Sequence, residues 1–92
     1  MQYMIIERYR PGKVKEMYRR FSEKGRMLPP GVTYINSWIN ESVTVCYQLM
    51  EATSIEQLQR WIDNWQDLVD FEIVTVISSA EAKEKVLNQP DS

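Results

Sequence analysis

The sequence predicts a single α+β domain in which strands and helices follow the order β-α-β-β-α-β, with a short helix added at the end. Four runs rich in β-branched and aromatic residues predict the strands. Two intervening segments carry apolar residues at helical spacing. With an antiparallel sheet and both helices on one face, this order is the ferredoxin-like arrangement. The chain has 92 residues, which fits one domain.

The first half contains one strand and one helix before a clear stop signal. Residues 2–9 (QYMIIERY) are predicted to form a strand that ends before Pro11-Gly12. A helix should follow, because apolar residues then recur at i, i+3, i+4 and i+7. These residues are Val14, Met17, Tyr18 and Phe21. Pro29-Pro30-Gly31 should end the segment.

Two strands and a hairpin turn occupy the middle of the chain. Residues 32–40 (VTYINSWIN) and 43–51 (VTVCYQLME) are predicted strands, and Glu41-Ser42 is the expected tight turn between them.

The second half is predicted to contain a strongly amphipathic helix, a strand and a weaker helix. Thr53 and Ser54 supply capping signals for the first of these helices. Its apolar face is expected to comprise Ile55, Leu58, Trp61, Ile62, Trp65, Leu68 and Val69. Residues 71–78 (FEIVTVIS) should form the fourth strand, and a short helix should run from Ser78 to about residue 88. We expect one domain over residues 1–88 and a frayed tail over 89–92.

Composition excludes several classes of site. The single cysteine, Cys46, rules out an intrachain disulfide, and the absence of histidine leaves too few ligands for a structural zinc. We therefore expect no metal and no cofactor, and no chemistry that depends on histidine.

No targeting segment or bilayer-spanning run is apparent, so a cytoplasmic protein with no membrane partner is expected. A chain this short often gains stability by oligomerisation.

Charge is unevenly distributed along the chain. Residues 1–28 hold eight of the eleven Lys and Arg, whereas the remainder holds ten of the thirteen acidic residues. A basic helix raises the possibility of nucleic-acid binding. An RNA-binding sheet of this topology needs a basic-glycine-aromatic block on its third strand, and VTVCYQLM lacks one. We expect the basic first helix and the acidic second helix to neutralise each other, and no nucleic-acid partner.

All four predicted strands are apolar on both faces. Two helices can cover only one face of the sheet, and the other face should then be polar, as it is in most antiparallel sheets. An exposed apolar sheet face is an aggregation hazard or an interface. The sequence therefore predicts a homodimer in which two copies pack sheet on sheet with twofold symmetry.

Three sequence blocks resemble a bacterial family of small stand-alone proteins, domain of unknown function 3303. They are IERYRPGKV, EKGRMLPPGVTYINSW, and CYQLMEA followed by W-x-x-x-W. This family resembles the dimeric α/β-barrel superfamily, which includes antibiotic-biosynthesis monooxygenase-like and muconolactone-isomerase-like proteins. The resemblance implies a dimeric α/β barrel with ligands inside it or in a cleft beside it, but no known reaction.

The predicted hairpin carries the candidate ligand-binding residues. If it turns through two residues, one face of the sheet groups Tyr34, Asn36, Trp38 and Tyr47. These residues either line a cavity for a small aromatic or apolar ligand or fill an ordinary sheet core. Gln48 in mid-strand needs a hydrogen-bond partner, which is either protein or ligand.

No catalytic residue is identified by the sequence. Cys46 has no histidine to activate it, and we interpret it as a small buried hydrophobe. Glu7 and Arg8 end the first strand and are expected at the solvated rim of the sheet.

Two functions remain open. One is small-molecule binding in or beside the barrel, either by a binding module or by a cofactor-independent oxygenase or isomerase. The other is a non-catalytic dimerisation and interaction module without a pocket.

Overall fold

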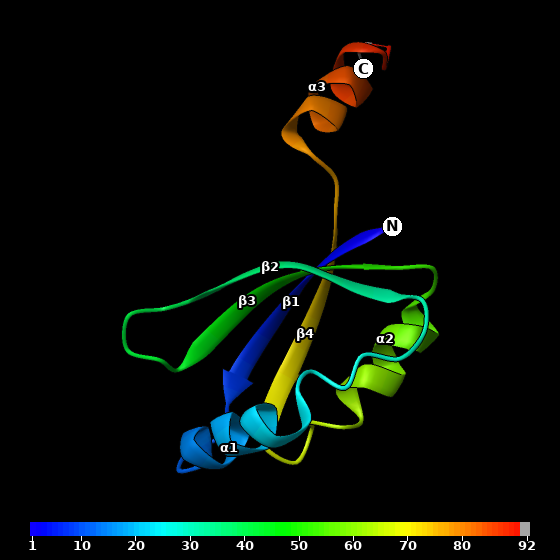
Figure 1. Ribbon diagram of the computed structural model, residues 1–92. Coiled ribbons are helices and arrows are strands. Elements are labelled where there is room, and N and C mark those ends of the chain that lie inside the picture. Colours follow the sequence, from blue (N-terminus) through cyan, green and yellow to red (C-terminus); the bar gives the residue numbers. More distant parts are fainter. Residues whose placement is uncertain (91–92) are drawn as a thin grey trace.

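The computed structural model describes residues 1–90 and has the ferredoxin-like α+β fold. Four strands form one antiparallel sheet in the order β2-β3-β1-β4 (Figure 1). The strands are β1 (Gln2–Tyr9), β2 (Val32–Ile39), β3 (Val45–Ala52) and β4 (Val69–Val76). The helices are α1 (Val14–Lys24), α2 (Ile55–Ile62) and α3 (Ser79–Leu87). The predicted strand and helix order is confirmed.

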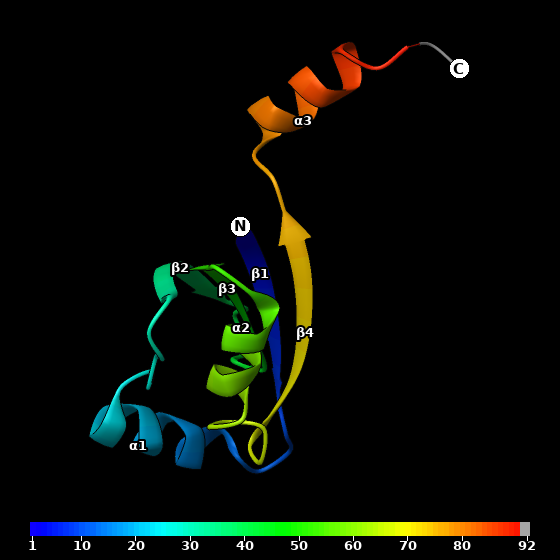
Figure 2. The ribbon, with the colours of Figure 1, turned by 90° about the vertical axis from the view of Figure 1, so that its right-hand side faces the viewer.

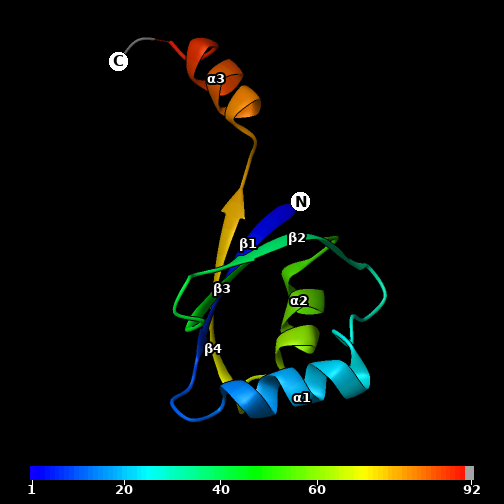
Figure 3. The same cartoon turned by 60° about the vertical axis from the view of Figure 1, so that its left-hand side comes forward.

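The helices α1 and α2 lie on the same side of the sheet but approach it differently. Figure 2 shows α2 close to the sheet, whereas α1 runs outward from the sheet's lower end. In Figure 3, α1 crosses beneath α2. Met17 is the buried residue of α1, and Tyr18 and Phe21 stay 38% and 36% exposed. Because α1 runs outward, the apolar side chains of Tyr18 and Phe21 stay partly exposed.

The core lies between the sheet and α2. Ile5 and Met50 of the two central strands and Leu58 of α2 are fully buried. Trp61 is 2% exposed and packs edge-on against Phe71, with ring centroids 5.6 Å apart. Aromatic rings packed in this way contribute a large part of the burial that stabilises a small domain.

Helix α2 ends earlier than the apolar pattern predicts. It stops at Ile62, and successive turns carry the chain to Val69, which already begins β4. The amides of Asn64, Trp65 and Leu68 each bond to a carbonyl three residues back, at 3.1, 2.8 and 3.0 Å. Such tight turns keep almost the same side-chain spacing as an α-helix. The predicted apolar residues are therefore buried, except Ile55, although the last three lie outside the helix.

The basic helix and the acidic segment meet as expected. Arg20 of α1 donates two hydrogen bonds of 2.8 Å to the carboxylate of Asp67, which follows α2. It also donates to the carbonyl of Asn64 at 2.9 Å. This pairing raises the pKa of Arg20 and lowers that of Asp67. The contact holds α1 against the turns that follow α2.

The opposite face of the sheet is uncovered and is apolar at its centre, with charged residues toward its ends. No helix within residues 1–90 lies over it (Figures 2 and 3). Trp38, Tyr47 and Val74 are 52%, 40% and 39% exposed there. Helix α3 projects away from the sheet and has no buried residue. The predicted tail, 89–92, lies only partly within the described residues. No helix among those described is long and apolar enough to cross a membrane.

Candidate functional site

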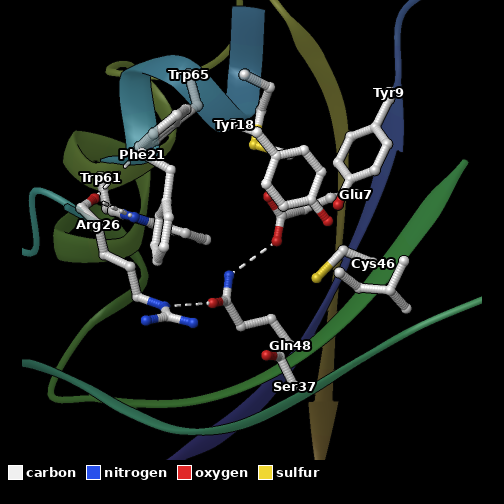
Figure 4. A pocket seen from close by; sticks show the side chains of 12 residues that line it. Glu7, Tyr9, Tyr18, Phe21, Arg26, Ser37, Cys46, Gln48, Trp61 and Trp65 are labelled. Carbon is white, nitrogen blue, oxygen red and sulfur yellow. Dashed lines mark hydrogen bonds between the residues drawn. The ribbon is translucent and has the colours of Figure 1, made fainter. Parts of the chain in front are cut away.

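A cavity of about 140 Å³ opens between the sheet and the outward-running α1. It is bounded by side chains from β1, β2 and β3, from α1 and the segment that follows it, and from α2 and the turns after it. Its lining residues are Glu7, Tyr9, Met17, Tyr18, Phe21, Arg26, Ser37, Ile39, Cys46, Gln48, Trp61 and Trp65. Figure 4 shows Tyr18, Phe21 and Trp65 on the helical side of the cavity and the polar side chains of Gln48 and Ser37 on the sheet side.

Strand pairing places a carboxyl group in the sheet wall of this cavity. Side chains alternate along β1, so Glu7 faces the same side as the buried Ile5. Glu7 pairs with Cys46 of β3, and Ile5 pairs with Gln48. The carboxyl of Glu7 and the amide of Gln48 are consequently neighbours, 8% and 4% exposed.

A continuous hydrogen-bonded chain joins Glu7 to Arg26. The Nε2 of Gln48 donates to Oε2 of Glu7 at 2.8 Å. The Nε of Arg26 donates to Oε1 of Gln48 at 2.9 Å (Figure 4). Both polar ends of the glutamine amide are therefore paired, which offsets the cost of burying it. The amide links a carboxyl group on the sheet to a cation on the facing loop.

Arg26 is held in place through its side chain and its backbone. Its guanidinium lies 3.6 Å from the ring centre of Tyr34 and 5.0 Å from that of Phe21. Its carbonyl accepts hydrogen bonds from the indole Nε1 of Trp61 and of Trp65, at 3.0 and 3.1 Å. Cation–π contacts and two buried indole donors hold this loop residue in one position.

Burial dominates the electrostatics of the cavity. It raises the pKa of Glu7 from 4.5 to about 7, against the opposing effects of the Cys46 thiol, the Arg26 charge and the Gln48 amide. The pKa of Cys46 rises to about 12 through burial and the neighbouring Glu7, so the thiol stays protonated. The pKa of Tyr9 is also raised, mainly by burial. Glu7 is thus the group of this set that exchanges a proton near neutral pH.

A comparison with known protein families finds a match over nearly the whole chain. The family described as Domain of unknown function (DUF3303) matches residues 1–89. The chain belongs to the DUF3303 family. No curated protein and no solved structure gives a significant match.

In the DUF3303 protein, the aromatic cluster predicted on one face of the hairpin is divided between the two faces. A register shift between Tyr34 and Asn36 is the cause. Tyr34 pairs with the buried Met50 and therefore faces the cavity side, where its hydroxyl bonds Ser37 Oγ at 2.8 Å. After the shift, Asn36 pairs with Leu49, and the sides of the strand are exchanged.

Trp38 and Tyr47 pair with each other on the uncovered face. With Asn36 they lie on the far side of the sheet from Gln48. The predicted grouping of Tyr34 with Asn36, Trp38 and Tyr47 is therefore wrong. Of the five candidates, Gln48 lines the cavity and Tyr34 supports Arg26 beside it.

Two polar residues of this site were not recognised from the sequence of the DUF3303 protein. Glu7 was expected at a solvated rim and is instead buried, whereas Arg8 is exposed and pairs with Glu72. The alternation of Tyr3, Ile5 and Glu7 on one side of β1 is the signal that could have revealed the buried carboxyl. Arg26 carries no such signal, because it lies in the irregular segment after α1.

The donor set of the site does not suggest a metal centre. Among residues 1–90, no three or more Cys, Asp or Glu side chains form a group able to hold an ion. What this DUF3303 pocket offers is a buried acid, a nearby cation and planar aromatic walls.

Proposed function

We propose that this DUF3303 protein binds a small planar organic molecule in the cavity between the sheet and α1. The observation that carries the proposal is the buried Glu7 carboxyl in the wall of that cavity. Burying an ionisable group is unfavourable, and such groups concentrate at sites that use them. The Gln48 amide donates a hydrogen bond to the Glu7 carboxyl, and the Arg26 guanidinium donates to that amide.

Size and shape favour a single ring. A closed apolar cavity of about 150 Å³ is sufficient for benzene, and this one has a volume of about 140 Å³. The aromatic rings of Tyr18, Phe21 and Trp65 line its helical side (Figure 4). Aromatic walls favour flat partners through stacked or edge-on contact. Proton exchange with the bound molecule is the chemistry that Glu7 can perform there without a cofactor.

Filling the cavity should weaken binding. Cys46→Leu adds apolar volume at the cavity wall, so its affinity for phenol should fall at least about tenfold below that of the wild type. The matched control is Val45→Leu, one residue earlier in β3 and on the other face of the sheet, which should bind as the wild type does. Isothermal titration calorimetry measures both. No phenol binding to the wild type, or equal binding by Cys46→Leu, would count against the proposal.

We also propose that the protein is a homodimer through its uncovered sheet face. The cross-strand pair Trp38 and Tyr47 lies on that face with Leu49 and Val74, and no helix within residues 1–90 covers it. Exposed apolar patches of this kind mark interaction sites. A second copy supplies a matching apolar face by symmetry.

A charge placed on this face should produce a monomer. Trp38→Glu is expected to give a mass near 10.9 kDa in light scattering at micromolar concentration, whereas the wild type gives twice that mass. Ile55→Glu places the same charge at an exposed apolar position of α2, on the other side of the sheet, and should leave the dimer intact. A wild-type protein of monomer mass would refute this interface.

A further inference from the structure

Arg26 uses only part of its hydrogen-bonding capacity within the protein. Its Nε donates to Gln48, but within residues 1–90 neither terminal nitrogen makes a hydrogen bond. The four salt bridges of this part of the chain involve Arg8, Arg10, Lys13 and Arg20, and so leave the Arg26 charge without a directly paired carboxylate. A planar pair of N–H donors therefore remains available at the cavity.

The geometry of this guanidinium is fixed before any ligand arrives. It lies 3.6 Å from the ring centre of Tyr34 and 5.0 Å from that of Phe21. The backbone carbonyl of Arg26 accepts hydrogen bonds from two indoles. A guanidinium with fixed orientation loses little conformational entropy when it binds a planar oxyanion. Carboxylates match its parallel donors in a two-bond arrangement.

The Glu7 carboxyl faces the same cavity, on the other side of the Gln48 amide from Arg26. The hydrogen bonds of that amide, 2.9 Å to Arg26 and 2.8 Å to Glu7, place the two charged groups on either side of it. A single ring with polar groups at opposite ends can lie alongside the amide and reach both. A hydroxyl suits the position facing Glu7, because it can donate to the carboxyl whether or not the carboxyl is protonated.

We propose that the cavity takes a single-ring aromatic hydroxy acid, whose carboxylate is bound by Arg26 and whose ring hydroxyl donates to Glu7. This inference rests on the proposed binding function and specifies its ligand class. The ring lies among Tyr18, Phe21 and Trp65. In this arrangement the ligand supplies the anion that Arg26 lacks within the protein and leaves the Gln48 link between the two groups intact.

Two probes that differ only at the carboxylate test the inference. 4-Hydroxybenzoate and its neutral methyl ester are titrated into wild-type protein, Arg26→Gln and the control Arg19→Gln by calorimetry. Arg19 is an exposed cation of α1 outside the cavity. We expect the wild type and Arg19→Gln to prefer the carboxylate by at least about tenfold, and Arg26→Gln to show less than about a twofold preference.

The outcomes separate this inference from the binding function beneath it. Equal affinity of the wild type for both probes overturns the carboxylate assignment, while phenol binding sensitive to Cys46→Leu still supports the cavity as a ligand site. Binding of neither probe also overturns the assignment. If Arg26→Gln does not fold, Arg26→Lys retains the charge without the paired donors and should reduce the preference; an unchanged preference in that variant contradicts the model.

Discussion

The Glu7→Gln variant is expected to lose a pH dependence of stability worth about 3 kcal/mol. In the wild type, burial raises the pKa of Glu7 from 4.5 to about 7. The native protein therefore binds a proton that the unfolded chain releases between these values. This contribution to stability is fully present below about pH 4.5 and is lost as the pH rises through about 7. Glutamine stays neutral, so its contribution does not change.

Urea unfolding at several pH values measures this effect. The free energy of unfolding of Glu7→Gln minus that of the wild type should rise by about 3 kcal/mol between about pH 4 and pH 8.5. Other titrating groups cancel in the difference. Glu23→Gln, at an exposed position of α1, is the control for the loss of one carboxyl group. A constant difference for Glu7→Gln would show that the carboxyl ionises as freely in the native state as in the unfolded chain.

The Trp61→Ala variant should lose about 3–5 kcal/mol of unfolding free energy. Trp61 is 2% exposed, packs against Phe71, and donates its indole N–H to the Arg26 carbonyl. The truncation leaves a cavity in the core and removes one of the two anchors of the Arg26 loop. Since small domains have only about 5–15 kcal/mol of stability, this single change consumes a large part of it.

Trp61→Phe separates packing from anchoring. It keeps an aromatic ring in the core but removes the indole donor, while Trp65 still donates to the same carbonyl. We expect it to lower the unfolding free energy by about 1–2 kcal/mol. It should also weaken ligand binding, because the Arg26 loop loses one of its two indole donors. Urea denaturation measures the first quantity and calorimetry the second. A loss from Trp61→Ala no larger than that from Trp61→Phe would show that the ring's volume contributes little.

The fold could be predicted from the sequence because its signals are local and periodic. Runs of β-branched and aromatic residues identify the strands, and apolar residues at helical spacing identify the two main helices. The order of these elements restricts the topology. The end of α2 could not be placed, because Trp65 and Leu68 keep helical spacing while the backbone already turns.

The candidate site was only partly predictable, and the failures have local causes. One irregularity after Tyr34 exchanges the two sides of β2, and alternation alone does not reveal it. Gln48 was recognised because an amide in mid-strand requires a partner. Arg26 reaches the site from an irregular loop, where no periodicity gives the direction of a side chain.

The central claim is that ligand binds on the helical side of the sheet and not on its uncovered face. The three tryptophans report on this directly, because Trp61 and Trp65 line the cavity whereas Trp38 lies on the other face. Titration of ¹⁵N-labelled protein with 4-hydroxybenzoate or phenol should shift the indole N–H signals of Trp61 and Trp65 and the side-chain amide of Gln48, and leave that of Trp38 in place. A shift confined to Trp38 would place the ligand on the uncovered face and contradict the account.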